Sequence, residues 1–345
     1  MRSRAGFFIL GTAVLSLILS SCNGGGQTGG GSAPSKTSNI TLAGNSVART
    51  VYEKGLIPAF KTAYEKAHPG QSVDFTESYE GSGAQERAIE AGLKADIAAL
   101  SLSPEIDKLA TNGLASKDWA KDANHGIPAT SVVVLVVRAG NPKGIKDWSD
   151  LYRDGIDVVL PNPDTSGAAQ WNIAAIDAYA KNNDFAKGAA GSLDPSLWVL
   201  KQIRSHVKAF GKSGKEAQQI FSSGTGDVMV GWECEALDRK AAGDQIDIVY
   251  PSTTIQMEPP VAVITPKGQQ PNPAAAEFVK FLSTSDAQKI YVQYHYRPRD
   301  ASVLAAIQQP FAPIQNLVTI DKLGGWETVQ KRLFGPEGLW AKAAE

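Results

Sequence analysis

The sequence predicts an α/β fold with mostly parallel sheets, and two observations lead to this prediction. Strand-like and helix-like segments alternate from Ile40 onwards, as they do in chains that form parallel sheets covered by helices. An unbroken apolar run rich in β-branched residues, from Ser131 to Val137, is typical of a central strand that is buried on both faces. The alternation suits two lobes of similar size, although pattern alone does not locate the crossings between them.

The elements follow from local periodicity. Strands are expected at residues 40–43, 72–75, 95–100, 131–137, 157–160, 227–231 and 246–250. Helices are expected at 47–66, 85–93 and 104–109. The first helix is broken or restarted at Pro58, because proline disrupts a helix interior, whereas Pro104 stands at a helix start, where its missing N–H costs nothing.

The first 22 residues are an export signal rather than part of the fold. Arg2 and Arg4 precede an apolar segment of about 13 residues, whereas a spanning helix needs roughly 20. The following Leu19-Ser20-Ser21-Cys22 resembles the bacterial lipobox, in which the cysteine carries lipid; the alternative is a plain signal peptide with an incidental cysteine. Residues 23–39 are rich in Gly, Ser and Thr, so we expect a flexible tether.

Composition and motifs exclude several classes of function. With 34 basic and 35 acidic residues, a net charge of -1 argues against nucleic acid as a partner. Gly211-Lys212-Ser213 lacks the upstream glycine of a P-loop, since that position is His206, and the four histidines are too far apart for a metal motif. Cys234 is expected to be a packed apolar residue rather than a nucleophile. No metal, cofactor or catalytic group is expected.

The informative feature is a repeated junction, in which a strand ends, small polar residues follow and a helix begins. It occurs at residues 42–46, 76–83, 159–167 and 210–214. Ser82 with Gln85, and Ser213 with Glu216, match the capping box. A helix start leaves N–H groups unpaired and carries about half a positive charge, and glycine allows a ligand to approach closely.

Several helix starts converging on one point would hold an anion without a cationic side chain. Trp232 ends an expected strand, and its indole is a donor without an acceptor, which suits a fully ionised anion. The alternatives are that the serines and glycines merely cap helices and that Trp232 packs in the core with its N–H on a carbonyl.

At these junctions the sequence resembles the sulfate/thiosulfate-binding proteins of bacterial ABC importers. The likeness runs from about Ile40 to the C-terminal region, and its most specific pieces occur in a fixed order: Gly81-Ser82-Gly83, Val137 to Lys143, Pro161-Asn162-Pro163, Ser166-Gly167, Trp171-Asn172, Trp232-Glu233, Tyr296 to Asp300 and Gly324-Gly325-Trp326.

The resemblance implies a two-lobed type II periplasmic-binding-protein fold with the ligand in the cleft between the lobes. The expected lobes are residues 40–129 with 253–345, and residues 130–252. The implied function is capture of sulfate or thiosulfate outside the cytoplasm and delivery to the importer permease, without catalysis, by a monomer that is anchored through lipid on Cys22.

Carried over residue by residue, the family's sulfate donors are uncharged. They are the Ser166 hydroxyl, the Trp232 indole, and the backbone N–H groups of Ser46, Ser82, Gly167, Ala168 and Ser213. At the fourth junction, matching the glycines instead would shift the donor toward Gly214.

This sequence departs from the family at Ser46, Glu80 and Ala168, where the family usually has aspartate, glycine and glycine. Glu80 would repel a dianion or accept a proton from hydrogen phosphate, which leaves phosphate or molybdate as alternative ligands. A surface hydrolase using Ser166 or Ser82 is the remaining alternative, but no histidine spacing supports it.

Overall fold

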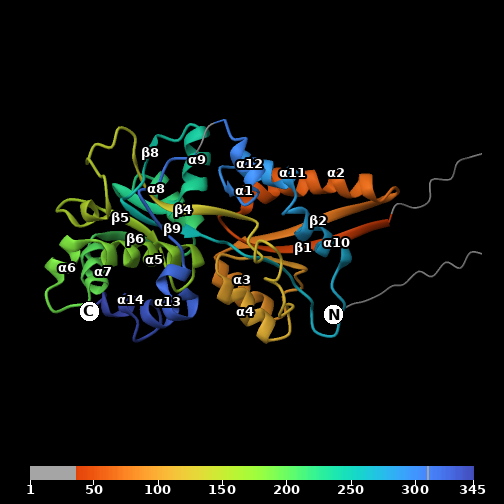
Figure 1. Ribbon diagram of the computed structural model, residues 1–345, viewed down its shortest axis with the longest axis horizontal. Coiled ribbons are helices and arrows are strands. Elements are labelled where there is room, and N and C mark those ends of the chain that lie inside the picture. Colours follow the sequence, from red (N-terminus) through yellow and green to blue (C-terminus); the bar gives the residue numbers. More distant parts are fainter. Residues whose placement is uncertain (1–35, 309–310) are drawn as a thin grey trace, which may run out of the picture. The chain divides into compact units, whose positions relative to one another are not determined.

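The computed structural model describes residues 36–308 and 311–345, and two sheets organise this part of the chain (Figure 1). Cys22, the predicted signal and most of the predicted tether lie outside the described residues. The smaller sheet has the order β10-β3-β1-β2. Its strands are β1 (Lys36–Asn45), β2 (Gln71–Glu80), β3 (Ile97–Ala99) and β10 (Val261–Val263). β1 runs parallel to β2 and to β3, and β10 is antiparallel to β3.

The larger sheet has the order β12-β9-β4-β7-β5-β6, with β8 and β11 also paired to β4. Its strands are β4 (Ala129–Arg138), β5 (Val158–Pro161), β6 (Val207–Gly211), β7 (Val228–Trp232), β8 (Ile246–Val249), β9 (Thr253–Met257), β11 (Arg297–Pro298) and β12 (Asn316–Val318). β5 is parallel to β6 and β7, and β9 is parallel to β12.

Helices cover the sheets. The first ones along the chain are α1 (Arg49–Val51), α2 (Ile57–Ala67), α3 (Ser82–Glu90), α4 (Ser103–Thr111), α5 (Gly167–Asn182), α6 (Asp184–Ala190) and α7 (Pro195–Ser205). They are followed by α8 (Gly214–Ser222), α9 (Glu233–Ala241), α10 (Pro273–Phe281), α11 (Ser285–Gln293), α12 (Ala301–Ala305), α13 (Gly325–Leu333) and α14 (Leu339–Lys342). Short 3₁₀ turns occupy Trp148–Tyr152 and Asp321–Leu323. Within the described ranges, no helix has the length and apolar character that crossing a bilayer requires.

Alternation along the strands builds a core on each face of each sheet. In the smaller sheet, Leu42 packs in the cluster that includes Phe60 of α2, whereas its neighbour Ala43 packs with Ile106 of α4. Figure 1 shows α2 on one side of β1 and β2, and α3 and α4 on the other. In the larger sheet, successive β4 valines likewise enter different clusters, one with α5 and the other with α8 and α9.

The structure corrects part of the sequence-based description. The larger sheet is mixed rather than mostly parallel, because β4 runs antiparallel to β7, β8, β9 and β11, whereas the smaller sheet is mostly parallel as predicted. An apolar run indicates burial but carries no information on strand direction. β1 begins at Lys36, so residues 36–39, expected in the tether, are strand paired with Gln71 to Asp74.

The helix is not broken at Pro58, but the α-helix restarts there, which was the other expected outcome. A π-helical turn, Tyr52–Leu56, leads directly into α2, and Pro58 lies in the first turn of α2, where its missing N–H is tolerated. β9 and β12 pair within the larger sheet, although the expected division assigns residues 253–345 to the lobe of the smaller sheet. The lobe boundaries therefore stay a prediction.

Candidate functional site

The four predicted junctions are all strand-to-helix connections in the structure. β1 leads to α1, β2 to α3, β5 to α5 and β6 to α8, and each connection follows the carboxyl end of its strand. In an open α/β sheet, ligands bind at that edge. The helices α3 and α8 have nine residues and α5 has sixteen, so each is long enough to present a full N-terminal turn.

The second, third and fourth junctions lie against one another. A Cβ at Gly81 would be only 2.5 Å from the carbonyl oxygen of Thr165 and 3.3 Å from that of Lys212. The Thr165 hydroxyl donates to the Lys212 carbonyl at 2.7 Å. Glycine at position 81 is therefore required by close backbone approach, as the sequence pattern indicated.

The first junction joins the same group of residues. A Cβ at Gly214, the first residue of α8, would lie 3.1 Å from Cγ2 of Val47 and 3.8 Å from Cβ of Ala168. A Cβ at Gly167, the first residue of α5, would lie 3.2 Å from Cβ of Ser82. The structure thus brings together residues from all four junctions, although they are up to about 170 positions apart in the sequence.

Several backbone donors at these helix starts have no acceptor. Among the described residues, no hydrogen bond is made by the N–H groups of Ser82, Gly167, Ala168, Ser213 and Gly214. Ser166 is the N-cap of α5, but its side chain accepts no helix N–H. Unpaired N–H groups at the positive end of a helix favour an anion.

The two predicted capping boxes have different outcomes. The Ser213 hydroxyl accepts the Glu216 N–H at 3.2 Å as predicted, but the Glu216 carboxylate accepts the N–H of Lys212 rather than that of Ser213. The prediction for Ser82 and Gln85 is wrong, because the N-cap of α3 is Gly81 and the Ser82 hydroxyl donates to the Glu105 carboxylate. That contact leaves only the backbone N–H of Ser82 for a ligand.

Ser46 is the exception among the predicted backbone donors. Its N–H donates to the carbonyl of Glu80 at 2.8 Å and continues the pairing of β1 with β2. The next two N–H groups donate to the side-chain oxygen of Asn45, each at 3.1 Å. The role of Ser46 as an anion donor stays a prediction, and it requires the bond to Glu80 to be exchanged.

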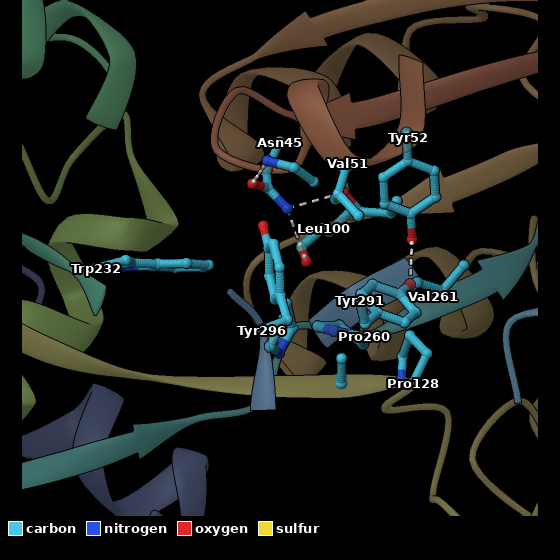
Figure 2. Close-up of a pocket in the computed structure, with 14 residues that line it drawn as sticks. Asn45, Val51, Tyr52, Leu100, Pro128, Trp232, Pro260, Val261, Tyr291 and Tyr296 are labelled. Carbon is cyan, nitrogen blue, oxygen red and sulfur yellow. Dashed lines mark hydrogen bonds between the residues drawn. The ribbon is translucent and has the colours of Figure 1, made fainter. Parts of the chain in front are cut away.

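Trp232 is buried at the end of β7, and its indole N–H has no hydrogen-bond partner among the residues that the structure describes. The alternative, a core tryptophan whose indole donates to a carbonyl, therefore does not describe Trp232. It does describe Trp148 and Trp171, whose indoles both donate to carbonyls at 2.8 Å. Figure 2 shows Trp232 at one end of a small pocket with Asn45 and Tyr296 nearby. A buried donor without an acceptor calls for an explanation, and a ligand provides one.

The predicted residues do not line one open cavity. Ser46 and Ser213 line a pocket of about 480 Å³ together with Glu80, Lys212 and Lys215. Ser166 and Gly167 line another of about 210 Å³, while the pocket beside Trp232 has only about 20 Å³. Ser82 and Ala168 are buried and line none of these three pockets, so the predicted donors do not share one cavity.

Two carboxyl groups next to the helix starts have strongly shifted pKa values. Burial raises the pKa of Glu105 to about 7, although hydrogen bonds from Ser82 and from the N–H of Leu102 act in the opposite direction. Burial also raises the pKa of Glu235 to about 7, opposed by the charge of Lys215. Glu235 lies close to Gly214, because one of its carboxylate oxygens is 3.8 Å from the position that a Cβ on Gly214 would occupy.

Sequence reasoning missed Asn45, Ser101, Glu105 and Glu235. Asn45 could have been found, because an asparagine just before a helix is a frequent N-cap. Ser101 follows β3 and precedes α4, so it belongs to a fifth strand-to-helix connection that lacks glycine and was not recognised. Cys234 is buried, as predicted, and burial raises the pKa of its thiol.

The starts of α3, α5 and α8 bring unpaired N–H groups close together at strand ends, an arrangement that can hold an anion. The chain belongs to the family of bacterial extracellular solute-binding proteins, whose model matches residues 49–297. Membership of this family places the protein outside the cytoplasm.

Two known relatives are similar to this chain over most of its length. The chain is 34% identical to a sulfate-binding protein of Synechococcus elongatus over 97% of this chain and 94% of the relative. It is 34% identical to a thiosulfate-binding protein of Pseudomonas aeruginosa over 82% of this chain and 85% of the relative.

Among solved structures, the sulfate-binding protein of Mycobacterium tuberculosis is 37% identical, with a TM-score of 0.78, and covers 86% of this chain and 99% of its own. The resemblance inferred from the sequence and the type II periplasmic-binding-protein fold are thereby confirmed. These relatives are named as binding proteins and not as enzymes.

Proposed function

We propose that the protein binds sulfate, or thiosulfate, outside the cytoplasm and delivers it to an ABC importer. The observation that carries this proposal is the meeting of α3, α5 and α8 at their N-terminal ends, with unpaired N–H groups and the unpaired indole of Trp232 close by. The relatives that cover most of the chain are named for sulfate and thiosulfate.

The proposed donors are the Ser166 hydroxyl, the Trp232 indole and the backbone N–H groups of Ser46, Ser82, Gly167, Ala168 and Ser213, with Gly214 as the alternative to Ser213. All of them are uncharged donors, which match an anion that carries no proton. Sulfate would bridge residues that follow strands of both sheets. Its binding energy would then favour the closed arrangement that docks on the permease.

Glu80 supports hydrogen phosphate as the second candidate. Its side chain lines the same pocket as Ser46 and Ser213, and a carboxylate in that position can accept the proton of hydrogen phosphate. Lys212 and Lys215 line this pocket too and would offset the repulsion between Glu80 and a dianion. Molybdate presents the same tetrahedral oxygens and would compete for the same donors.

The surroundings of Ser82 and Ser166 favour binding without catalysis. In the described part of the chain, no histidine makes a hydrogen bond to Ser82 or Ser166. The Ser82 hydroxyl is already engaged with Glu105 and with the N–H of Ser101. A Ser–His nucleophile would need a histidine within hydrogen-bond reach, and the carboxylate that Ser82 does contact, Glu105, is buried with it.

We further propose that the protein is a monomer held at the membrane through lipid on Cys22, with the following Gly- and Ser-rich residues as its tether. The support is the order of a basic start, a short apolar segment and Leu-Ser-Ser-Cys. Mass spectrometry of the membrane-extracted protein should find a lipid-modified N-terminal Cys22. Release of the native protein by salt washing alone would contradict the anchor.

Calorimetric titration of the purified protein with sulfate, thiosulfate, phosphate and molybdate tests the function. We expect saturable heat with sulfate or thiosulfate at one ligand per chain, and retention of that binding in Glu80→Gln. If phosphate alone produces heat and Glu80→Gln abolishes it, the second candidate replaces the first. No heat with any of the four anions would refute the proposed function.

A further inference from the structure

The Ser101 hydroxyl is a polar group that neither the family resemblance nor the four junctions assign. Ser101 is 1% exposed, and its oxygen has no hydrogen-bond partner among the described residues. Most buried hydroxyl groups are paired, so an unpaired one in the interior needs a reason.

The backbone of Ser101 is fixed on both sides. Its N–H donates to the Ser82 hydroxyl at 2.7 Å, at the start of α3. Its carbonyl accepts the Trp171 indole N–H at 2.8 Å, from the second turn of α5. The side chain is therefore the only polar part of Ser101 that the protein leaves without a partner.

Ser101 also lies against the beginning of α5. Its Cβ is 2.7 Å from the position that a Cβ on Gly167 would occupy, and that position is 3.2 Å from Cβ of Ser82. Ser101 thus packs beside two residues, Ser82 and Gly167, whose N–H groups have no acceptor among the described residues. The unpaired groups of Ser82 and Gly167 are N–H donors, so the partner that they lack is a hydrogen-bond acceptor.

We propose that Ser101 is a further ligand of the bound anion, and that its hydroxyl donates a hydrogen bond to one of the anion's oxygens. The inference rests on the proposed function, because it adds a donor to the same oxyanion site. It adds a fifth strand end, that of β3, to the four that the sequence indicated. The hydroxyl rotates freely, so it can follow an oxygen as the helix starts close around the ligand.

The test compares Ser101→Ala with Ser103→Ala by calorimetric titration of the full chain with sulfate. Ser103 is the matched control, since it is the first residue of α4, two positions further along the same connection. Loss of a hydrogen bond to a charged ligand should raise the Kd of Ser101→Ala about tenfold to a hundredfold. The Kd of Ser103→Ala should stay within about twofold of the wild type.

Thermal melting without sulfate provides a second readout. Because the hydroxyl has no partner in the unliganded protein, Ser101→Ala should melt at the same temperature as the wild type or higher. Ser101→Cys replaces the hydroxyl with a slightly larger group that is a weaker donor, and it should give a Kd between those of the wild type and Ser101→Ala.

The outcomes separate the two proposals. If the wild type binds sulfate and Ser101→Ala binds it equally well, this inference is overturned and the proposed function stands. A lower melting temperature for Ser101→Ala with an unchanged Kd would assign the hydroxyl a structural role and also overturn it. If the wild type binds no sulfate, the proposed function itself is refuted.

Discussion

The guanidinium of Arg297 makes two hydrogen bonds to the carboxylate of Glu233, at 2.7 and 2.8 Å. Glu233 is fully buried and directly follows Trp232, while Arg297 comes from β11, far along the chain. This bidentate pair ties the start of α9 to the C-terminal part of the chain. It therefore holds in place the segment that carries the unpaired indole.

Arg297→Gln should destabilise the protein strongly, because it leaves the Glu233 carboxylate buried without its cation. Removing one partner of a buried ion pair costs about 3–5 kcal/mol of unfolding free energy. Urea unfolding measures the loss. Lys289→Gln, which breaks an exposed pair with Asp286, serves as the control and should cost less than about 1 kcal/mol. Equal effects of the two substitutions would show that the Arg297 pair is not structurally important.

Trp232→Phe should weaken sulfate binding with less loss of stability than Trp148→Phe. Both substitutions remove similar volume from a buried position, so the comparison isolates the indole N–H. Trp148 donates to the carbonyl of Thr253, and losing that bond should cost about 1–3 kcal/mol more in unfolding free energy. Calorimetry and urea unfolding of both variants test the difference. A tighter or unchanged Kd for Trp232→Phe would remove the indole from the site.

Gly81→Ala should reduce both sulfate affinity and stability, whereas Gly83→Ala should not. A Cβ at position 81 would meet the Thr165 carbonyl at 2.5 Å, and such overpacking typically costs about 1–3 kcal/mol. At position 83 the nearest atom is 3.4 Å away, and alanine favours a helix over glycine by roughly 1 kcal/mol. The melting temperature should therefore fall for Gly81→Ala and hold or rise for Gly83→Ala, and sulfate titrations should show weaker binding for Gly81→Ala alone. A harmless Gly81→Ala would mean that the junctions are not tightly packed.

Glu105→Gln should change how stability depends on pH. Burial raises the pKa of Glu105 in the folded protein from 4.5 to about 7, so the folded state holds this proton more tightly than the unfolded chain. Its stabilising contribution is therefore fully present below about pH 4.5 and is lost as pH rises through about 7.

Glutamine mimics the protonated carboxyl and can still accept the hydrogen bonds from Ser82 and Leu102. Relative to that of the wild type, the melting temperature of Glu105→Gln should accordingly rise as the pH increases through the interval in which Glu105 titrates, about pH 4.5 to 7. Thermal unfolding between pH 5 and pH 8 measures this difference. A constant difference across this interval would show that Glu105 does not titrate there.

Most strands up to residue 250 could be predicted from the sequence, because apolar periodicity reports burial. Strands such as β5 and β7 were located to within one residue at each end. Strand direction could not be predicted, since β4 has the same apolar run whether its neighbours are parallel or antiparallel. The end of β6 was expected at the junction of residues 210–214, but its range was not predicted, because only its last residue is buried and the pattern is weak.

The candidate site could be predicted in part for a similar reason. Glycine at positions 81, 167 and 214 marks close backbone approach, and the sequence shows it directly. The Ser46 N–H donates to the Glu80 carbonyl because β1 and β2 pair in the register that places Asn45 opposite Glu80. This register is a tertiary property. Ser101 has no glycine beside it to mark it, because its importance comes from tertiary contacts of Ser101 with the beginnings of α3 and α5.

The most direct test of the central claim is an NMR titration of the ¹⁵N-labelled protein with sulfate. If uncharged donors at converging helix starts hold the anion, the backbone N–H protons of Ser82, Gly167, Ala168 and the Ser213–Gly214 pair should shift downfield together with the Trp232 indole proton. These shifts should saturate at one sulfate per chain. If those resonances stay in place while sulfate binds, with shifts confined to exposed lysines and arginines, the claim is contradicted.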